Sequence, residues 1–308
     1  MDQLAALKVF VRIAETGGFG KASDALDIPR ATVTKLVQDL EQHLGVKLFQ
    51  RTTRKVSVTE EGRAYYQRAM QLLTELDEMD VLFSDSKHGP RGRLRVDVGS
   101  SLANIILIPK LIDFREAFPD VRLELGVSDR HVDLVGDAVD CVIRGGELTD
   151  TSLVARRIAS FDYVTCASAA YVKKHGMPSH PDDLRDVHET VGYFSSLSGR
   201  PFPLMFQRND EQIEVDPRSS RGLLLNESTG HLSALVQGLG VGQTFGFMAR
   251  KYVDDGTLVP VLTEWTRPLH HIHIVFQRSK HESVRLRTFI EWAAKIFAPY
   301  DRQGTAFH

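Results

Sequence analysis

The chain of 308 residues, with 42% apolar and 25% charged residues, has the composition of an ordinary globular protein and the length of two domains, which excludes a disordered or collagen-like chain. No apolar run reaches the ~18–20 residues of a membrane-spanning helix, and the first residues lack the regions of a signal peptide, so we expect a cytoplasmic protein without membrane contact. The net charge of −2 argues against binding to nucleic acid. However, six basic and two acidic residues lie between residues 28 and 58, a local excess that suits phosphate contacts unless it is only a solvated face.

Three helices are predicted at the start of the chain. The apolar residues from Leu4 to Ala14 have helical spacing, and a second short helix covers about residues 21–26. Pro29 then breaks the chain and starts a third helix, which ends at Gly45. Two helices joined by a short turn, the second polar and basic on one side, are typical of a helix-turn-helix whose second helix enters the major groove. The candidate DNA-binding residues on this side are Arg30, Ala31, Thr32, Thr34, Lys35 and Gln38.

A β-hairpin is predicted to follow this helix. Leu48 and Phe49 provide apolar anchors, and residues 55–58 alternate like a strand. The turn between them carries arginines placed to reach the DNA backbone or the minor groove. The candidate contact residues here are Arg51, Thr52, Thr53 and Arg54. Residues 1–58 therefore predict a winged helix-turn-helix domain.

Residues 17–62, GGFGKASDALDIPRATVTKLVQDLEQHLGVKLFQRTTRKVSVTEEG, resemble the DNA-binding signature of the LysR-type transcriptional regulators. They share the small-residue helix, the hydroxyl-rich recognition helix and the spacing LG-x-x-LF-x-R-x-x-R-x-V-x-x-T-x-x-G. One departure is Pro29, where the family usually has a serine that caps the recognition helix. The resemblance implies a homodimer or homotetramer that binds an inverted-repeat operator on double-stranded DNA, contacts RNA polymerase and responds to a small-molecule effector.

A long helix is predicted over residues 59–88, with acidic side chains in its first turn and a break at the glycine and proline that follow it. Six apolar residues recur along it at spacings of four and three, which is a heptad seam. Packing onto the rest of the same chain is one interpretation of the seam, and pairing with a second subunit, as the family resemblance implies, is the other. The candidate dimerisation residues are Tyr65, Ala69, Leu72, Leu76, Met79 and Phe83.

From Gly92 onward strands alternate with helices, which predicts a parallel sheet built from β-α-β units. The expected strands cover residues 94–98, 121–127, 139–144, 163–167, 241–244, 258–262 and 271–276, and the expected helices cover 101–118, 131–138, 228–237 and 281–297. The segments FPDVRLEL, DCVIRGGELTDTSLVARRI and LVQGLGVGQTFGFMARKYVDDGTLVPVL resemble the regulatory domain of the same family. This implies an α/β domain over residues 89–308 with two lobes of periplasmic-binding-protein type. Lobe I would be residues 92–162 and 269–302, lobe II would be residues 163–268, and an effector would bind between them.

Small and polar residues follow several of the predicted strands. Ligands of open α/β sheets bind beyond the carboxyl ends of strands, where the amino-termini of helices present free amides. The guanidinium of Arg144 can pair with a carboxylate, although a structural ion pair and ordinary helix capping by the serines are the alternatives. These positions suit a small anionic or polar effector. The candidate effector-binding residues are Gly99, Ser100, Ser101, Arg144, Gly145, Ser195, Ser196, Thr244 and Phe245.

Other patterns indicate neither a catalytic nor a metal site. Strand alternation puts His271 and His273 on one face and His270 on the other, without a nearby third ligand, so a surface or interface position is expected. Cys141 and Cys166 lie in apolar strands and are interpreted as core residues, with a redox switch as the alternative. No nucleophile-elbow or P-loop motif occurs, so we expect neither an enzyme nor a cofactor. The alternatives to an effector-controlled regulator are a cytoplasmic small-molecule-binding protein and an architectural DNA binder.

Overall fold

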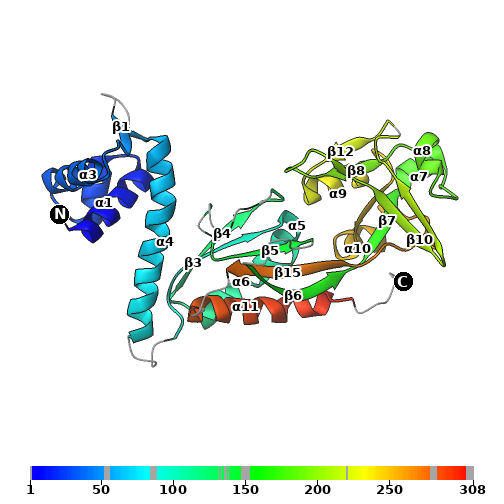
Figure 1. Cartoon of the computed structure of the whole chain (residues 1–308). Coiled ribbons are helices and arrows are strands. Elements are labelled where there is room, and N and C mark those ends of the chain that lie inside the picture. The colour runs from blue at the N-terminus through cyan, green and yellow to red at the C-terminus, as the bar shows by residue number, and fades with distance from the viewer. Residues whose placement is uncertain are drawn as a thin grey trace. The chain divides into compact units, whose positions relative to one another are not determined.

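The computed structural model describes residues 2–51, 56–83, 89–130, 132, 134, 137, 139–146, 153–219, 221–277 and 283–302. The chain forms two compact units that divide after residue 88 (Figure 1). The amino-terminal unit is helical with a small hairpin, and the carboxy-terminal unit is built on β-sheets with helices against them. None of the described helices is both long and apolar enough to cross a membrane.

The amino-terminal unit is a helix-turn-helix followed by a hairpin and a long helix, as predicted. It consists of α1 (Gln3–Thr16), α2 (Phe19–Leu26), α3 (Arg30–Leu44), β1 (Phe49–Arg51), β2 (Val56–Val58) and α4 (Glu60–Phe83). The apolar stripes of the helices face one another around Phe10, which is fully buried. Its ring centroid lies 5.2 Å from that of Phe49 and 5.4 Å from that of Tyr65. These ring contacts join α1 to the hairpin and to α4.

Glu41 is buried where α3 meets the hairpin, an uncommon position for a carboxylate. One carboxylate oxygen accepts hydrogen bonds from the backbone amides of Leu48, at 2.9 Å, and Phe49, at 3.2 Å. The other oxygen accepts from Lys47 Nζ at 2.8 Å. Burial alone would raise the pKa of Glu41, but these donors stabilise the anion and hold the pKa below its usual value. The carboxylate therefore fixes the start of the hairpin against α3.

A five-stranded mixed sheet forms the first half of the carboxy-terminal unit. Its order is β4 (Val121–Val127), β3 (Gly92–Val98), β5 (Cys141–Gly145), β15 (His270–Gln277) and β6 (Leu153–Phe161). Strand β3 runs parallel to β4 and β5, whereas β15 runs antiparallel to β5 and β6. Helix α11 (Val284–Phe297) packs its apolar stripe on this sheet and buries Phe289 and Phe297 completely. We call this half lobe I.

The second half of the unit, lobe II, comes from the chain between β6 and β15 (Figure 1). One three-stranded sheet has the order β13 (Gly242–Phe245), β7 (Tyr163–Ser168) and β14 (Leu258–Pro260). A second has the order β12 (Leu223–Leu225), β8 (Val191–Phe194) and β9 (Pro201–Phe202). The strands β10 (Leu204–Arg208) and β11 (Glu211–Val215) form a separate hairpin. The helices of lobe II are α7 (Ala169–His175), α8 (Asp183–Asp186), α9 (Ser228–Val236) and α10 (Gly246–Asp254). Because the chain leaves lobe I after β6 and returns with β15, lobe II is an insertion into lobe I.

The single regular helix predicted over Ser101–Phe118 is wrong. This segment forms α5 (Ser100–Leu102), the π-helical turn η1 (Ala103–Leu107), the 3₁₀ turn η2 (Ile108–Lys110) and α6 (Leu111–Ala117). Pro109 explains the irregularity at η2, because proline has no amide hydrogen to donate to the preceding turn. The apolar spacing survives the change, so Ile106, Leu107 and Phe114 are still buried.

The prediction of a parallel sheet holds for β3, β4 and β5 in lobe I and for the pair β8 and β12 in lobe II. After lobe II the chain enters β15, which runs antiparallel to its neighbour β5. In lobe II, β13 and β14 both pair antiparallel with β7. Strand periodicity reports which face is buried and carries no information on direction, which is why the sequence did not reveal this. The hairpin β10–β11 was also not predicted. Of the helix expected over His131–Ala138, only residues 132, 134 and 137 are described, and none of the three is helical. The first residues of the helix expected from His281 lie outside the described residues.

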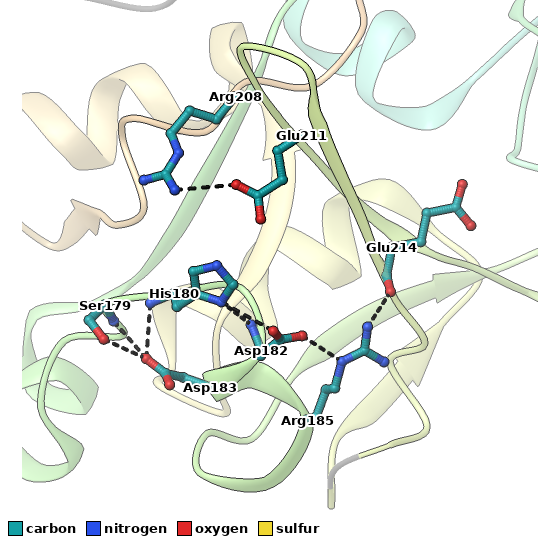
Figure 2. A network of polar contacts seen from close by, with 8 residues as sticks. All are labelled: Ser179, His180, Asp182, Asp183, Arg185, Arg208, Glu211 and Glu214. Carbon is teal, nitrogen blue, oxygen red and sulfur yellow. Dashed lines mark hydrogen bonds and ion pairs between the residues drawn. The ribbon is translucent and has the colours of Figure 1, made fainter.

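A polar surface network joins the start of α8 to the hairpin β10–β11 in lobe II (Figure 2). Asp183 accepts hydrogen bonds from the amides of His180, at 3.0 Å, and Ser179, at 2.8 Å, which lower its pKa. Arg185 donates to the backbone carbonyl of Glu214 on β11 at 2.7 Å. Exposed polar contacts of this kind add little stability. The network therefore orders a surface loop.

The replacement Glu41→Gln should destabilise the amino-terminal unit, because an amide cannot match the carboxylate's bonds to two backbone amides and a lysine. We expect a loss of about 1–3 kcal/mol at neutral pH. The folded-state pKa of Glu41 lies below its unfolded value, so this stabilisation is present above the unfolded pKa and is lost as the pH falls through the folded pKa. Thermal melts at about pH 7 and about pH 3 should show the difference between variant and wild type shrinking in acid.

The matched control is Glu15→Gln, which removes an exposed carboxylate paired with Arg12. This change should cost less than about 0.5 kcal/mol. Equal stability of the two variants at neutral pH would contradict the prediction.

Candidate DNA-binding and effector sites

Helix α3 presents its predicted polar side to solvent. Val33, Val37 and Leu40 are fully buried on the opposite side, and residues three and four apart share a face of a helix. Thr34 is half-buried, and its hydroxyl donates to the backbone carbonyl of Arg30 at 2.9 Å, so this hydroxyl is engaged within its own helix. The exposed residues of the predicted face are Arg30, Ala31, Thr32, Lys35 and Gln38.

Pro29 occupies the position before α3 with φ −54° and ψ 137° and gives the helix no side-chain cap. Its fixed φ is compatible with a helix start, so the helix begins at Arg30 in spite of the missing cap. The departure from the family pattern therefore changes the cap and leaves the position of the helix intact.

The hairpin places Arg51 at the end of β1, where it pairs with Val56 across the strands. The hydroxyl of Thr59 donates to the carbonyl of Lys47 at 2.7 Å and accepts from the amide of Gly62 at 2.9 Å. Thr59 thus caps α4 and joins it to the base of the hairpin. The predicted contact residues that lie outside the described residues are Thr52, Thr53 and Arg54.

The predicted seam of α4 divides into two parts. Tyr65 packs on the core of its own unit and Ala69 is only 1% exposed, so these two residues already have their contacts within the chain. Leu72 is 57% exposed, and Leu76 is half-buried. The members of the seam whose side chains are not described are Met79 and Phe83. Among the described side chains of the seam, Leu72 is therefore the first that is exposed enough to contact a second subunit.

Asp129, which the sequence reasoning missed, joins lobe I to lobe II. Oδ1 accepts a hydrogen bond from the amide of Ser100 at 2.6 Å, and Oδ2 accepts one from the amide of Ser228 at 2.6 Å. The hydroxyl of Tyr193 lies 3.2 Å from Oδ2 as a further donor. One carboxylate therefore binds the first amides of two helices, one in each lobe. The sequence could have identified Asp129, because it follows the strand β4 closely, just as the candidate residue Gly99 follows β3.

Ser100 and Ser101 are buried and take part in this interlobe contact. The hydroxyl of Ser100 donates to Glu227, and the amide of Ser101 donates to the hydroxyl of Ser228 at 3.2 Å. Glu227 also accepts from two amides in the first turn of α9. Burial alone would raise the pKa of Glu227, but these donors hold it below its usual value. The amides of Ser100 and Ser101, which the sequence offered to an anionic effector, thus already donate to a carboxylate and a hydroxyl of the chain itself.

Arg144 forms an ion pair with Asp97 on the neighbouring strand β3, and both side chains are partly buried. The structure therefore shows a structural ion pair, which was the alternative interpretation of Arg144. The Nε atom of Arg144 is buried without a hydrogen-bond partner. Gly145 lies against His270, because a Cβ added at this glycine would meet the imidazole Nε2 at 1.8 Å. Only glycine fits at the end of β5 with the imidazole in this position.

The candidate effector residues of lobe II lie in different surroundings. Ser195 accepts hydrogen bonds from two amides of its own loop, whereas the hydroxyl of Ser196 donates to the backbone carbonyl of Asp129 at 3.4 Å. Thr244 is buried inside lobe II, and Phe245 packs in an aromatic cluster at the start of α10. The predicted set is therefore not gathered at one place. Ser100, Ser101 and Ser196 take part in the contact around Asp129, whereas Gly145 and Phe245 lie against His270.

The histidines of β15 and the two cysteines lie in different surroundings. His271 is exposed, and the described residues contain no group of three His, Cys, Asp or Glu side chains that could hold a metal ion. Cys141 and Cys166 are fully buried, which confirms their interpretation as core residues. Burial raises the pKa of Cys166 to about 12 and that of Cys141 well above its usual value, so both thiols are protonated near neutral pH.

A surface depression of about 610 Å³ lies elsewhere in the carboxy-terminal unit, lined in part by Ile105, Phe247 and Tyr300. None of the candidate effector residues lines it. It is wide open to solvent, whereas small-molecule sites bury most of the ligand. The residues around Asp129 and His270 are therefore the stronger candidates.

Two family models match the chain: "Bacterial regulatory helix-turn-helix protein, lysR family" at residues 4–63 and "LysR substrate binding domain" at residues 87–298. The chain belongs to the LysR-type transcriptional regulators. It is a DNA-binding regulator with an effector-binding domain, and its relatives are transcriptional regulators.

The regulator is similar to relatives over nearly its whole length. It is 36% identical over 298 residues to an HTH-type transcriptional repressor of Pseudomonas aeruginosa, covering 97% of this chain and 93% of the relative. It is 32% identical to the regulator CrgA of Neisseria meningitidis serogroup C, covering 93% and 94%. The full-length structure of AphB, a virulence activator of Vibrio cholerae, matches with a TM-score of 0.61 and 28% identity over 95% of this chain and 98% of that one. The CrgA structure matches with a TM-score of 0.59 and 29% identity over 94% and 97%.

The replacement Asp129→Asn should weaken the contact between the lobes, because a neutral amide oxygen accepts more weakly than a carboxylate and the amide nitrogen cannot accept at all. We expect the carboxy-terminal unit to lose about 1–3 kcal/mol of stability. Thermal melts of the full chain measure this loss. The control Asp113→Asn changes an exposed carboxylate on α6 and should leave the melting temperature nearly unchanged. Identical melting of both variants would show that Asp129 does not hold the lobes.

Proposed function

We propose that the regulator binds an inverted-repeat operator as a homodimer or homotetramer, and that a small-molecule effector between lobes I and II controls this binding. Residues 1–58 act as the DNA-binding domain, residues 59–88 as the dimerisation linker and residues 89–308 as the effector-binding domain. The regulator acts in the cytoplasm, contacts RNA polymerase and catalyses no reaction.

The exposed polar side of α3 is the observation that carries this proposal. Lysine and glutamine side chains can donate to base edges in the major groove, and Lys35 and Gln38 lie on that side one turn apart. Arg30 lies at the start of the helix, where it can reach a phosphate. Arg51 and Arg54 of the wing are proposed to contact the backbone or the minor groove. The buried carboxylate of Glu41 supports this arrangement, since it anchors the hairpin to α3.

Exposure of Leu72 supports the proposed dimer. An apolar side chain 57% exposed on a long helix gains free energy when a second helix covers it. An inverted repeat presents two half-sites about one helical turn apart, so two copies of α3 must be held at a matching distance.

The contact around Asp129 supports effector control. A ligand shifts a conformational equilibrium only when it binds two states with different affinity. Groups from both lobes meet at this carboxylate, so a ligand that binds beside it contacts both lobes at once. Its affinity then depends on how the lobes are arranged.

The variant Lys35→Ala should change base preference at one position of each half-site and cost about 1–3 kcal/mol of operator binding. Titrations with operator and with random duplex DNA separate this effect from loss of phosphate contact. The control Lys110→Ala removes the same charge from an exposed position in the other unit and should bind like wild type. Equal losses of Lys35→Ala on operator and random DNA would assign Lys35 to the backbone.

The variant Leu72→Asp should impair dimerisation through α4 and weaken operator binding, because it introduces a charge into the proposed interface. Light scattering and operator titration measure both effects, and we expect operator affinity to fall at least about tenfold. Gln67→Asp adds a charge to an exposed position of the same helix away from the seam and is the matched control. If Leu72→Asp keeps the size and operator affinity of Gln67→Asp, the seam is not the dimer contact.

A further inference from the structure

Arg267, on the segment between β14 and β15, is a half-buried cation held in a fixed position. Its guanidinium carbon lies 3.9 Å from the ring centroid of Tyr163, and Nη1 donates to Gln243 Oε1 at 3.0 Å. Gln243 is itself held by the backbone of Met205 and by the hydroxyl of Thr165. Stacking and a pinned amide orient the guanidinium, while the hydrogen bond to Gln243 uses only one of its donors.

No ion pair among the described residues includes Arg267. This distinguishes it from Arg144, which is paired with Asp97, and from Arg208, which also lies over an aromatic ring in lobe II. Arg208 is paired with Glu211 at 3.3 Å (Figure 2) and with Glu264 at 3.3 Å. Burial lowers the pKa of Arg267, yet a guanidinium stays protonated near neutral pH. A partly desolvated charge that has no ion pair among the described residues is in an unfavourable arrangement, which an anionic ligand would stabilise.

Within the described part of the chain, the groups that contact Arg267 carry no opposite charge. Burial, followed by the charge of Arg267, lowers the pKa of His270 to about 4, and burial also lowers the pKa of His231. Both imidazoles are therefore neutral near pH 7. The ring of Phe245 lies 5.4 Å from that of His270 and 4.7 Å from that of Tyr163, so apolar ring surface adjoins the guanidinium. A cation beside aromatic rings suits an organic anion better than a hydrated inorganic ion.

The amides expected to bind an anion are occupied. Asp129 accepts from the amides of Ser100 and Ser228, and Glu227 accepts from the next amides of α9. An anionic ligand at these helix starts would meet two carboxylates. This disfavours the anion position expected from the sequence and favours Arg267.

We propose that Arg267 binds the carboxylate of the effector, and that the effector is a small organic acid. This inference rests on the proposed function, because it names the ligand class of the same effector-binding domain.

The test uses the full chain and pairs of acids with their neutral amides: benzoate with benzamide, succinate with succinamide and lactate with lactamide. Thermal stabilisation and operator titration are measured for wild type, Arg267→Gln, Arg267→Lys and Arg208→Gln. We expect at least one acid to stabilise the wild type while its amide does not. Arg267→Gln should weaken that binding about 10- to 100-fold, Arg267→Lys should weaken it less, and Arg208→Gln should bind like wild type. Arg267→Lys also keeps the test valid if Arg267→Gln does not fold.

Three results would overturn the inference: no acid stabilises the wild type, an amide stabilises it as well as its acid does, or both arginine→glutamine variants lose equal affinity. If an amide alters operator affinity and no acid does, the result supports effector control of DNA binding and contradicts carboxylate binding by Arg267. If an acid binds through Arg267 without altering operator affinity, the result supports the ligand site at Arg267 and contradicts the proposal that the ligand controls DNA binding.

Discussion

The carboxylate of Asp129 bonds to the first amides of two helices that belong to different lobes. The described chain passes between the lobes after β6 and again before β15, and the polar contacts around Asp129 join them at a third place. Partly buried, charge-assisted hydrogen bonds are stronger than neutral ones, and each is costly to leave unmade. Ser100, Ser101 and Ser196 all take their positions from this contact. A change at this carboxylate therefore reaches both lobes.

In the amino-terminal unit a carboxylate also accepts hydrogen bonds from backbone amides, but there it joins a helix to a hairpin. Glu41 is a buried carboxylate that accepts two backbone amides and a lysine, and it holds the hairpin against α3. Without such donors a buried Glu41 would be protonated or exposed, because desolvation disfavours its charged form. Glu41 thus holds the hairpin at the helix proposed to bind DNA, and Asp129 joins the two lobes between which the effector is proposed to bind.

The arginines of the carboxy-terminal unit show how pairing separates structural cations from a candidate ligand site. The guanidinium groups of Arg144 and Arg208 have carboxylate partners, so their charges are compensated within the chain. Among the described residues, Arg267 instead contacts an aromatic ring and an amide oxygen. These contacts orient the group but do not cancel its charge. An effector site needs both properties, since a ligand must find the donor in place and must gain from binding it.

The sequence by itself determined the features that depend on residues close together in the chain. Helical spacing, the break at Pro29 and the alternation after the third helix predicted the helix-turn-helix and the hairpin, and burial of Val33 and Val37 confirmed which side of α3 faces outward. The fixed spacing of the same segment identified the family. A helical face is set by residues three and four apart, so local order alone decides it.

Only the tertiary structure decided which polar groups are partners. The sequence selected Ser101 for its position after a strand, but its amide bonds to Ser228, 127 positions away. It offered Arg144 to an effector, whereas the neighbouring strand supplies Asp97. It passed over Arg267, because an arginine in a polar segment has no pattern that distinguishes a paired guanidinium from an unpaired one. Periodicity reports which side of an element is buried, whereas hydrogen-bond and ion partners are set by segments that meet only after folding.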